Sequence, residues 1–312
     1  MNIAKLSKEM KEAIGRSGYL LEQETATILK KKGFYVVPNY AFRDIETDTS
    51  KEIDVWGMMA KLLDNREGFE GIFPVLLIEV KNIFPLVCFT QDEVTARYTM
   101  GDFQFSGLPK YVWVKSTEGE ELLDFLKIEK FHHYYKTSRI ASQFCVISEN
   151  KRRRGNPNEP PFVASHRLSE DRNLYEEIAL PLIKGIMAEK EKHEKEWEFD
   201  HKREPINLQF YYPIAVVNGL FECYVGRKTP VYKKVHQINF IRRYESKQIS
   251  GEFRIDICDR LGFEQLVNVI NTEVEKIAKK IRNHKKLLQK SALIDAKEKY
   301  REQKNIKNKK RK

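Results

Sequence analysis

Two acidic residues and a lysine stand at positions from which they could act together on one phosphate. Glu79 and Lys81 close the apolar run 75–78, and Asp54 lies in an earlier apolar stretch, EIDVW. Because side chains alternate along a strand, Glu79 and Lys81 would project from the same face. A carboxylate and an ammonium at the end of an apolar strand cost free energy unless they are paired or bound to a metal. The spacing predicts a divalent-metal site, or, in the simpler interpretation, an exposed strand end with an ion pair.

The neighbouring segments indicate how these residues are positioned. Residues 18–33 repeat small or apolar side chains at helical spacing and end in three lysines and a glycine, which is typical of a helix terminus. Strands are predicted at 34–37, 53–58 and 72–81. The expected order is therefore a helix, a first strand, a strand with Asp54 and a strand with Glu79 and Lys81.

This order resembles the PD-(D/E)xK superfamily of restriction-endonuclease-like nucleases. Gly18, Glu22 and Gly33 match the family's first-helix pattern, Asp54 its metal-binding acid, and Glu79-Val80-Lys81 its acid-x-lysine strand. Two features depart from the family pattern. Asp54 is not part of a Pro-Asp pair, and residues 57–71 make the connection between the acidic strands longer than a tight hairpin. The matching positions run from Gly18 to Asn82.

The resemblance implies an α/β fold with a restriction-endonuclease-like mixed central sheet flanked by helices, additional strands and a long C-terminal helix. It implies a nuclease domain over residues 1–285. The catalytic core of that domain would span about 15–150, and further strands and helices would span 160–285. A basic C-terminal tail would follow at 286–312.

The resemblance also implies roles for the residues of the strand. Asp54 and Glu79 would each offer a carboxylate oxygen to Mg²⁺ or Mn²⁺, and the Val80 carbonyl would be a third ligand. Magnesium is a hard cation that prefers oxygen ligands and keeps several waters, so two carboxylates facing a phosphate suit it. Lys81 would hold the attacking water or stabilise charge in the transition state.

The predicted first helix would contribute one further acid to this site. Glu22 matches the family pattern and would bind a metal-bound water. Glu24 lies two residues further along the same helix, and the two side chains point in different directions. The sequence leaves open which of them faces the site.

Basic residues are concentrated in two places. Residues 279–312 hold 15 lysines and arginines against three acids, a net charge of +12, whereas the whole chain carries +11. The tail could grip a phosphate backbone, or it could be a solvated, partly helical extension. Lys151, Arg152, Arg153 and Arg154 form a second cluster in a predicted loop, which makes them candidates for nucleic-acid contact.

Other patterns predict structure rather than chemistry. Asn218-Gly219 between two apolar runs, 211–217 and 220–225, predicts a β-hairpin. Helical spacing predicts a helix at 263–281 and a long one at 168–202. A short helix is expected at 118–128, and strands at 144–148 and 161–165. These last two strands would flank the basic loop.

Two patterns that could suggest other chemistry favour structural roles. Asp256 lies in a strand-like stretch, but no acid-x-lysine strand follows it, so an ordinary sheet position is expected. His132 and His133 are adjacent, so their side chains should point apart and chelate poorly, and no H-x-x-x-H or C-x-x-C motif accompanies them. The chain also lacks a phosphate-binding G-x-x-x-x-G-K-[ST] loop and a G-x-S-x-G elbow.

The location of the protein is predicted from its apolar stretches and its cysteines. The longest apolar stretches are shorter than a membrane span, and the N-terminus lacks a secretory apolar region. Four unclustered cysteines fit reduced thiols. We expect a cytoplasmic protein without a membrane segment.

The expected function is hydrolysis of phosphodiester bonds in nucleic acid by a metal-dependent nuclease, with a role in restriction or defence by family likeness alone. DNA is the expected substrate, and RNA is an alternative. A second alternative is a non-catalytic nucleic-acid-binding or assembly module with a nuclease-like fold. A third is a globular protein whose acid-lysine group is accidental. The sequence leaves open whether the protein acts as a homodimer or with a partner subunit.

Overall fold

A pair of long parallel strands, β4 (Gly71–Lys81) and β11 (Asn207–Val217), forms the centre of the fold. Both strands are nearly continuous apolar runs that are buried on both faces, as expected for strands covered by helices on two sides. The computed structural model describes residues 7–63, 70–83, 85–92, 103–115, 118–149, 167–170, 174–197, 206–226 and 228–309.

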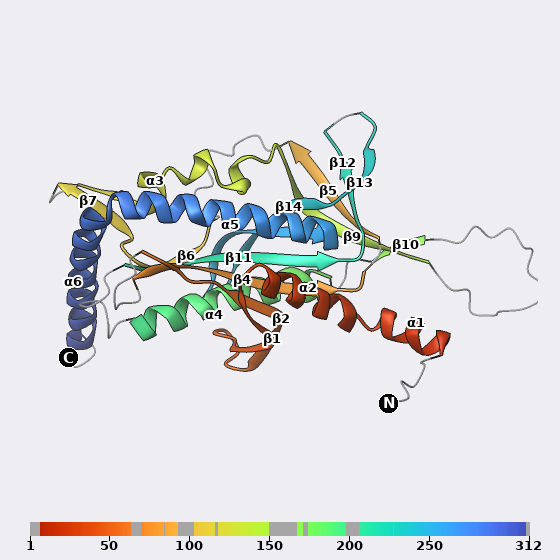
Figure 1. Cartoon of the computed structure of the whole chain (residues 1–312), viewed down its shortest axis with the longest axis horizontal. Coiled ribbons are helices and arrows are strands. Elements are labelled where there is room, and N and C mark those ends of the chain that lie inside the picture. Colours follow the sequence, from red (N-terminus) through yellow and green to blue (C-terminus); the bar gives the residue numbers. More distant parts are fainter. Residues whose placement is uncertain are drawn as a thin grey trace, which may run out of the picture.

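Helices and strands alternate irregularly along the chain (Figure 1). The helices are α1 (Lys8–Arg16), α2 (Tyr19–Lys31), α3 (Leu122–Phe125), α4 (Leu180–Trp197), α5 (Arg260–Asn283) and α6 (Lys285–Lys309), with the shorter turns η1 (Ile128–Lys130), η2 (His133–Tyr135) and η3 (Tyr175–Ala179). The remaining strands are β1 (Tyr35–Arg43), β2 (Ser50–Met58), β3 (Lys61–Leu62), β5 (Leu86–Asp92), β6 (Phe105–Leu108), β7 (Tyr111–Lys115), β8 (Glu118–Glu121), β9 (Arg139–Glu149), β10 (Arg167–Glu170), β12 (Leu220–Tyr224), β13 (Val231–Val235), β14 (Gln237–Glu245) and β15 (Ser250–Asp259).

Within the described residues, one mixed sheet contains thirteen strands. Its main path runs β1-β2-β4-β11-β15-β14-β9-β5-β12-β13, and β3, β6 and β10 pair with β4, β11 and β9. Strand β4 is antiparallel to β2 and parallel to β11, which is in turn parallel to β15. Parallel neighbours require crossovers, so the centre of the sheet joins segments far apart in sequence.

Helices cover both faces of the central strands. Helices α2 and α5 pack on one face and α4 packs on the other, which gives the sheet two separate apolar layers. Two glycines allow this close packing: a Cβ at Gly57 would lie 2.9 Å from Leu29 of α2, and one at Gly185 of α4 would lie 2.8 Å from Leu77. The strands that carry Asp54 and Glu79 are thereby held firmly between helices.

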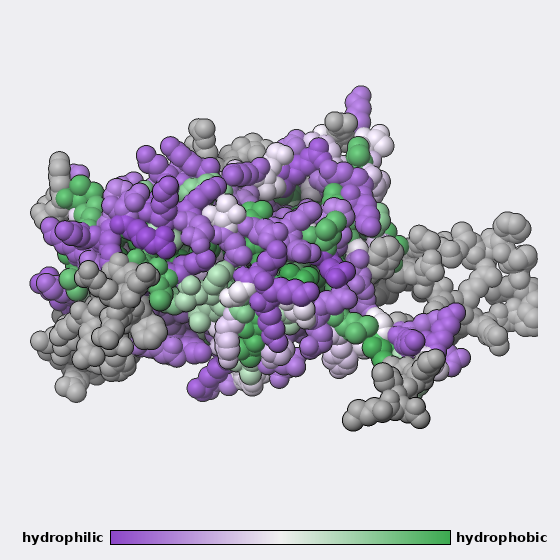
Figure 2. Space-filling model, viewed as in Figure 1, coloured by the Kyte–Doolittle hydropathy of each residue, from purple (hydrophilic) through white to green (hydrophobic). Residues whose placement is uncertain are grey.

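The coarse prediction of the fold is confirmed. The chain forms a mixed α/β structure with a large mixed sheet, flanking helices and a C-terminal helix. The expected first helix corresponds to α2, the two acid-bearing strands to β2 and β4, and the helix predicted at 263–281 to α5. The surface seen in Figure 2 is mostly hydrophilic, with scattered apolar residues. In the described part of the chain, every helix is too short or too polar to cross a membrane.

The predicted hairpin around Asn218-Gly219 is wrong in its pairing. Strands β11 and β12 form where expected, but β11 pairs with β4 and β15, and β12 pairs with β5 and β13. Both edges of β11 are therefore already occupied. At Gly219 the chain moves across to β5 instead of folding back, and the Gly219 carbonyl accepts a hydrogen bond from the amide of Leu86 at 3.0 Å.

Three other predicted segments differ in their limits. The stretch 118–128 begins as strand β8, which pairs with β7, and only 122–125 is α-helical. The stretch 168–202 begins in strand β10, and continuous helix starts at Leu174. The strand expected at 144–148 lies within β9, and the one expected at 161–165 lies outside the described residues.

The basic tail is helix α6, and its first half packs against the protein. Leu288, Ser291 and Asp295 are buried. The Asp295 carboxylate accepts hydrogen bonds from the amides of Lys110 and Tyr111 at 2.7 and 3.1 Å. Residues 286–295 therefore belong structurally to the folded body, although they carry part of the basic charge.

Candidate active site

The candidate site forms where β2 and β4 separate. Their backbone pairing ends at Val55 opposite Ile78, so the next residues of the two strands are no longer paired. The Asp54 side chain fills the opening, and its Oδ2 accepts a hydrogen bond from the Val80 amide at 2.7 Å. A side-chain carboxylate thus replaces the missing strand partner of Val80.

The backbone beside Asp54 is also irregular on its other side. In the β1–β2 ladder, Pro38 pairs with Val55 and Tyr40 with Ile53, but the intervening Asn39 and Asp54 are skipped. Asn39 has a positive φ of 49°, a left-handed conformation that asparagine adopts more readily than most residues. This local distortion coincides with the turn of the Asp54 side chain toward β4.

Lys81 joins the two carboxylates. Its Nζ lies 2.7 Å from Glu79 Oε2 and 3.4 Å from Asp54 Oδ2. The Glu79 side chain is only 4% exposed, whereas those of Lys81 and Asp54 are each 25% exposed. The three side chains predicted from the sequence to meet therefore do so, at the partly open end of a buried strand.

The charges in this group are strongly coupled. Burial, and then the neighbouring Asp54 carboxylate, raise the pKa of Glu79 to about 8 despite the opposing effect of Lys81. Burial alone would lower the pKa of Lys81, but Glu79 and Asp54 outweigh it and raise that pKa. Lys81 thus lies beside two acids, Glu79 and Asp54. An additional positive charge at this site would be stabilised by them.

Helix α2 brings Glu22 to the same site. The helix starts after Gly18, whose φ of +83° is suited to glycine, and a Cβ there would lie 3.9 Å from Glu22 Oε1 and 3.6 Å from Asn82. Burial and then Asp54 raise the pKa of Glu22, while Lys81 opposes them. Glu24 instead pairs with Arg260 at 2.9 Å. Of the two glutamates, Glu22 is therefore the one beside the site.

The donor set suits a hard divalent cation. Asp54 and Glu79 supply two carboxylates around a site that already favours positive charge. The N–H and C=O of one strand residue point to the same side of the strand, so the Val80 carbonyl faces the opening filled by Asp54. Oxygen ligands of this kind match Mg²⁺ or Mn²⁺, and the partial exposure leaves room for coordinated water.

The sequence also singled out a basic cluster and a pair of adjacent histidines. Lys151, Arg152, Arg153 and Arg154 lie outside the described residues. The prediction that the His132 and His133 side chains point apart is wrong, because their rings stack with centroids 4.5 Å apart. His132 caps the short turn η2, which places both rings on one side of the backbone.

His133 belongs to a buried ionic cluster that sequence reasoning missed. Its Nδ1 lies 2.9 Å from Glu273 Oε2, and its Nε2 lies 3.0 Å from Asp256 Oδ2. Burial would lower its pKa, but the two carboxylates raise it to about 10. Asp256 holds an interior sheet position, as predicted. No local pattern links His133 to acids 123 and 140 residues further along the chain.

His132, His133 and Glu273 offer ligand atoms that lie within 4.8 Å of one another, but the hydrogen bond made by His132 opposes metal binding through the nitrogen that faces Glu273. The Nδ1 of His132 accepts a hydrogen bond from the Tyr134 amide at 3.2 Å. Burial, first of all, keeps its pKa well below the usual value, so the ring is neutral and its proton is on Nε2. The nitrogen that faces Glu273 is then a donor rather than a lone pair.

Comparisons of the chain with models of protein families, with curated proteins and with solved structures find no match in any of the three. Function is therefore inferred from the residues and geometry of the site.

Proposed function

We propose that the protein is a metal-dependent nuclease of the restriction-endonuclease-like kind, and that it hydrolyses phosphodiester bonds in DNA. The observation that supports this most directly is the meeting of Asp54, Glu79 and Lys81 at the end of β4. A nearly buried glutamate beside a second acid, with one lysine shared between them, is an arrangement that a further cation would stabilise.

Each residue has a separate task in this proposal. Asp54, Glu79 and the Val80 carbonyl would hold Mg²⁺ or Mn²⁺, which would supply charge stabilisation at the scissile phosphate and acidify a bound water. Lys81 has a mobile ammonium within reach of both acids, so it can orient the attacking water or neutralise charge on the phosphate oxygens. Glu22, on the first turn of α2, would accept a hydrogen bond from a water at this site.

The test is cleavage of plasmid DNA, single-stranded DNA and RNA by the purified protein, with Mg²⁺, with Mn²⁺ and with EDTA. Glu79→Gln and Lys81→Met should each reduce cleavage by a factor on the order of 10² to 10³, because each removes a charge that acts on the reacting phosphate. Both changes nearly preserve side-chain volume, so circular dichroism should show an intact fold.

A second acid–lysine pair supplies the matched control. Lys61 and Glu275 form an ion pair of 2.5 Å on the surface. Lys61→Met and Glu275→Gln make the same chemical changes and should leave cleavage unchanged. Full activity in the Glu79 or Lys81 variant would reject the assignment. Metal-independent binding with no cleavage of any substrate would favour the non-catalytic binding module instead.

A further inference from the structure

A polar cavity lies in the second half of the sheet, apart from the candidate active site. Strands β9 and β14 run parallel, but within the described residues they are paired only at Ala141 and Phe240. Each begins earlier, at Arg139 and Gln237, and is bound on its outer side by β5 or β15. The starts of the two strands therefore leave a wedge-shaped opening in the sheet, with a cavity of about 520 Å³.

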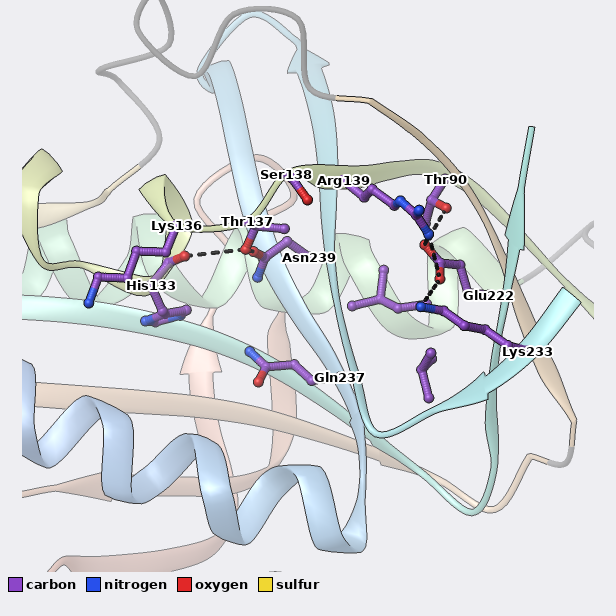
Figure 3. A pocket seen from close by; sticks show the side chains of 12 residues that line it. Thr90, His133, Lys136, Thr137, Ser138, Arg139, Glu222, Lys233, Gln237 and Asn239 are labelled. Carbon is purple, nitrogen blue, oxygen red and sulfur yellow. Dashed lines mark hydrogen bonds and ion pairs between the residues drawn. The ribbon is translucent and has the colours of Figure 1, made fainter. Parts of the chain in front are cut away.

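One wall of the cavity is organised around Glu222 of β12. This nearly buried carboxylate accepts a hydrogen bond from Thr90 at 2.7 Å and contacts both Arg139, at 3.3 Å, and Lys233, at 2.9 Å (Figure 3). The Arg139 guanidinium also lies 4.0 Å from the centre of the Tyr224 ring, which fixes its orientation. Two cations share one acid, so several of their N–H donors are available to a ligand.

The opposite wall carries amides and hydroxyls. Asn239 and Gln237 donate to Asp256 at 2.5 and 2.9 Å, and Thr137 donates to Asn239 at 2.5 Å. His133 lies behind them, and its charge is balanced by Asp256 and Glu273. Figure 3 shows the side chains of Thr137, Asn239 and Gln237 on this side. Val235 and Ile238 supply an apolar surface between the two walls.

The charge at the mouth of the cavity is positive. Arg139 and Lys233 place two cations against the single Glu222 on one side of the cavity, and the exposed Lys136 lies at the other side, with its side chain directed away from them (Figure 3). Within the described residues, the edges of β9 and β14 that face the wedge also carry backbone groups without a strand partner, and such groups bond to side chains, water or a ligand. The size falls within the range of pockets for small molecules.

We propose that this cavity binds a phosphate monoester the size of a nucleotide, with the phosphate at Arg139 and Lys233 and the remainder in the wedge. Guanidinium and ammonium groups provide the charged donors that a phosphate requires. The apolar and amide surfaces suit the rest of a nucleoside. The proposal does not depend on cleavage at the site of Asp54 and Glu79.

The test is isothermal titration calorimetry of the full chain in EDTA, with adenosine 5′-monophosphate and with adenosine as probes. The monophosphate should bind and adenosine should bind at least about tenfold more weakly, a difference of about 1.4 kcal/mol. Lys233→Ala, which removes an exposed cation while Arg139 still pairs with Glu222, should weaken binding of the monophosphate by a similar factor. Equal binding of the two probes, or no binding of either, would overturn the proposal.

Two control variants locate the binding. Lys31→Glu reverses an exposed charge at the end of α2, and Lys81→Met alters the candidate active site. Both should bind the monophosphate as the unchanged protein does. If Lys81→Met loses binding while Lys233→Ala keeps it, the ligand occupies the other site and the proposal fails.

A phosphate monoester could be a free nucleotide or the end of a nucleic-acid strand. A tetranucleotide with a 5′-phosphate and one with a 5′-hydroxyl distinguish these sources. If the phosphorylated strand binds more tightly than the monophosphate, and does so through Lys233, the cavity recognises strand ends. If the monophosphate binds more tightly, the ligand is a free nucleotide. Either pattern supports a phosphate monoester site.

Discussion

Lys81 is the residue on which the candidate active site depends, because it is the counter-ion of both acids. In the structure its ammonium occupies the space between Glu79 and Asp54. A cation bound by the two acids would take over their neutralisation and release the ammonium for contact with water or phosphate. In the proposed mechanism, the same three side chains stabilise the fold when no metal is bound and act on the substrate once it is.

His133 gives the clearest expected pH dependence at the scale of one residue. Its pKa in the folded protein is raised to about 10 from the ordinary value of 6.5, so folding favours the protonated ring. Its stabilising contribution is therefore fully present below about pH 6.5 and is lost as the pH rises through 10. Other groups also titrate in this range, so a variant is needed for comparison.

We expect His133→Gln to lower the free energy of unfolding by roughly 2 to 4 kcal/mol at pH 6, because it leaves Asp256 and Glu273 without their cation. The difference between the two proteins should narrow at pH 10.5, where the native ring is neutral. Urea denaturation at both pH values measures this. A difference that stays constant with pH would show that His133 is not charged in the folded protein.

At the scale of residues, the sequence predicted those sites whose chemistry follows from local spacing. Glu79 and Lys81 share a face because they are two apart on a strand, and this needs no tertiary information. The stacking of His132 and His133 could not be predicted in the same way, because it depends on the short turn that places them. The partners Asp256 and Glu273 come from a distant strand and helix.

At the scale of elements, the sequence predicted a basic C-terminal tail, and the structure shows a helix, α6, whose first half packs against the folded body. Asp295 accepts hydrogen bonds from two backbone amides and, at 2.7 Å, from the Trp113 indole. Asp295→Ala would leave these donors without a partner. We expect the free energy of unfolding to fall by about 2 to 4 kcal/mol.

Glu298→Ala is the control for this change, since Glu298 is exposed one turn further along α6. It should alter the free energy of unfolding by less than about 0.5 kcal/mol. Equal effects of the two variants in urea denaturation would mean that α6 does not stabilise the folded body through Asp295.

The elements themselves were more predictable than their pairing. Apolar runs and helical spacing locate β2, β4, α2 and α5, because burial imposes those patterns on the local sequence. The Asn218-Gly219 signal located a turn, but strand pairing there is decided by which edges are already occupied. That information lies in β4, β15 and β5, far from the turn in sequence.

At the scale of the whole molecule, the distribution of charge is the basis for expecting nucleic acid as the partner. Residues 1–278 carry about one net negative charge, and the excess positive charge lies beyond them. Removing the C-terminal segment is a poor test of its role, because Ser291 and Asp295 are buried in the folded body. Exposed lysines of α6 allow a cleaner one.

We expect Lys286→Ala, Lys290→Ala and Lys297→Ala together to reduce the salt dependence of DNA binding. Each phosphate that a lysine no longer neutralises should lower the slope of log K against log salt by about 0.9, or by about 2.7 for all three. Filter binding in EDTA over a series of salt concentrations measures the slope. Alanine at Lys30, Lys31 and Lys51, which are exposed elsewhere, removes the same charge and is the control; equal slopes in the two variants would exclude a special role for α6.

The route of the two central strands has a consequence for the candidate active site. The parallel pair β4 and β11 is continued, after short connections, by the parallel pair β5 and β12. The side chains of Asn82 and Asn218 are hydrogen-bonded where these connections pass each other. Lys81, the last residue of β4, therefore directly precedes the connection that leads from the first parallel pair to the second. We expect that any change in the angle between the β4–β11 pair and the β5–β12 pair would shift Lys81 relative to Asp54, because Lys81 directly precedes the connection between them.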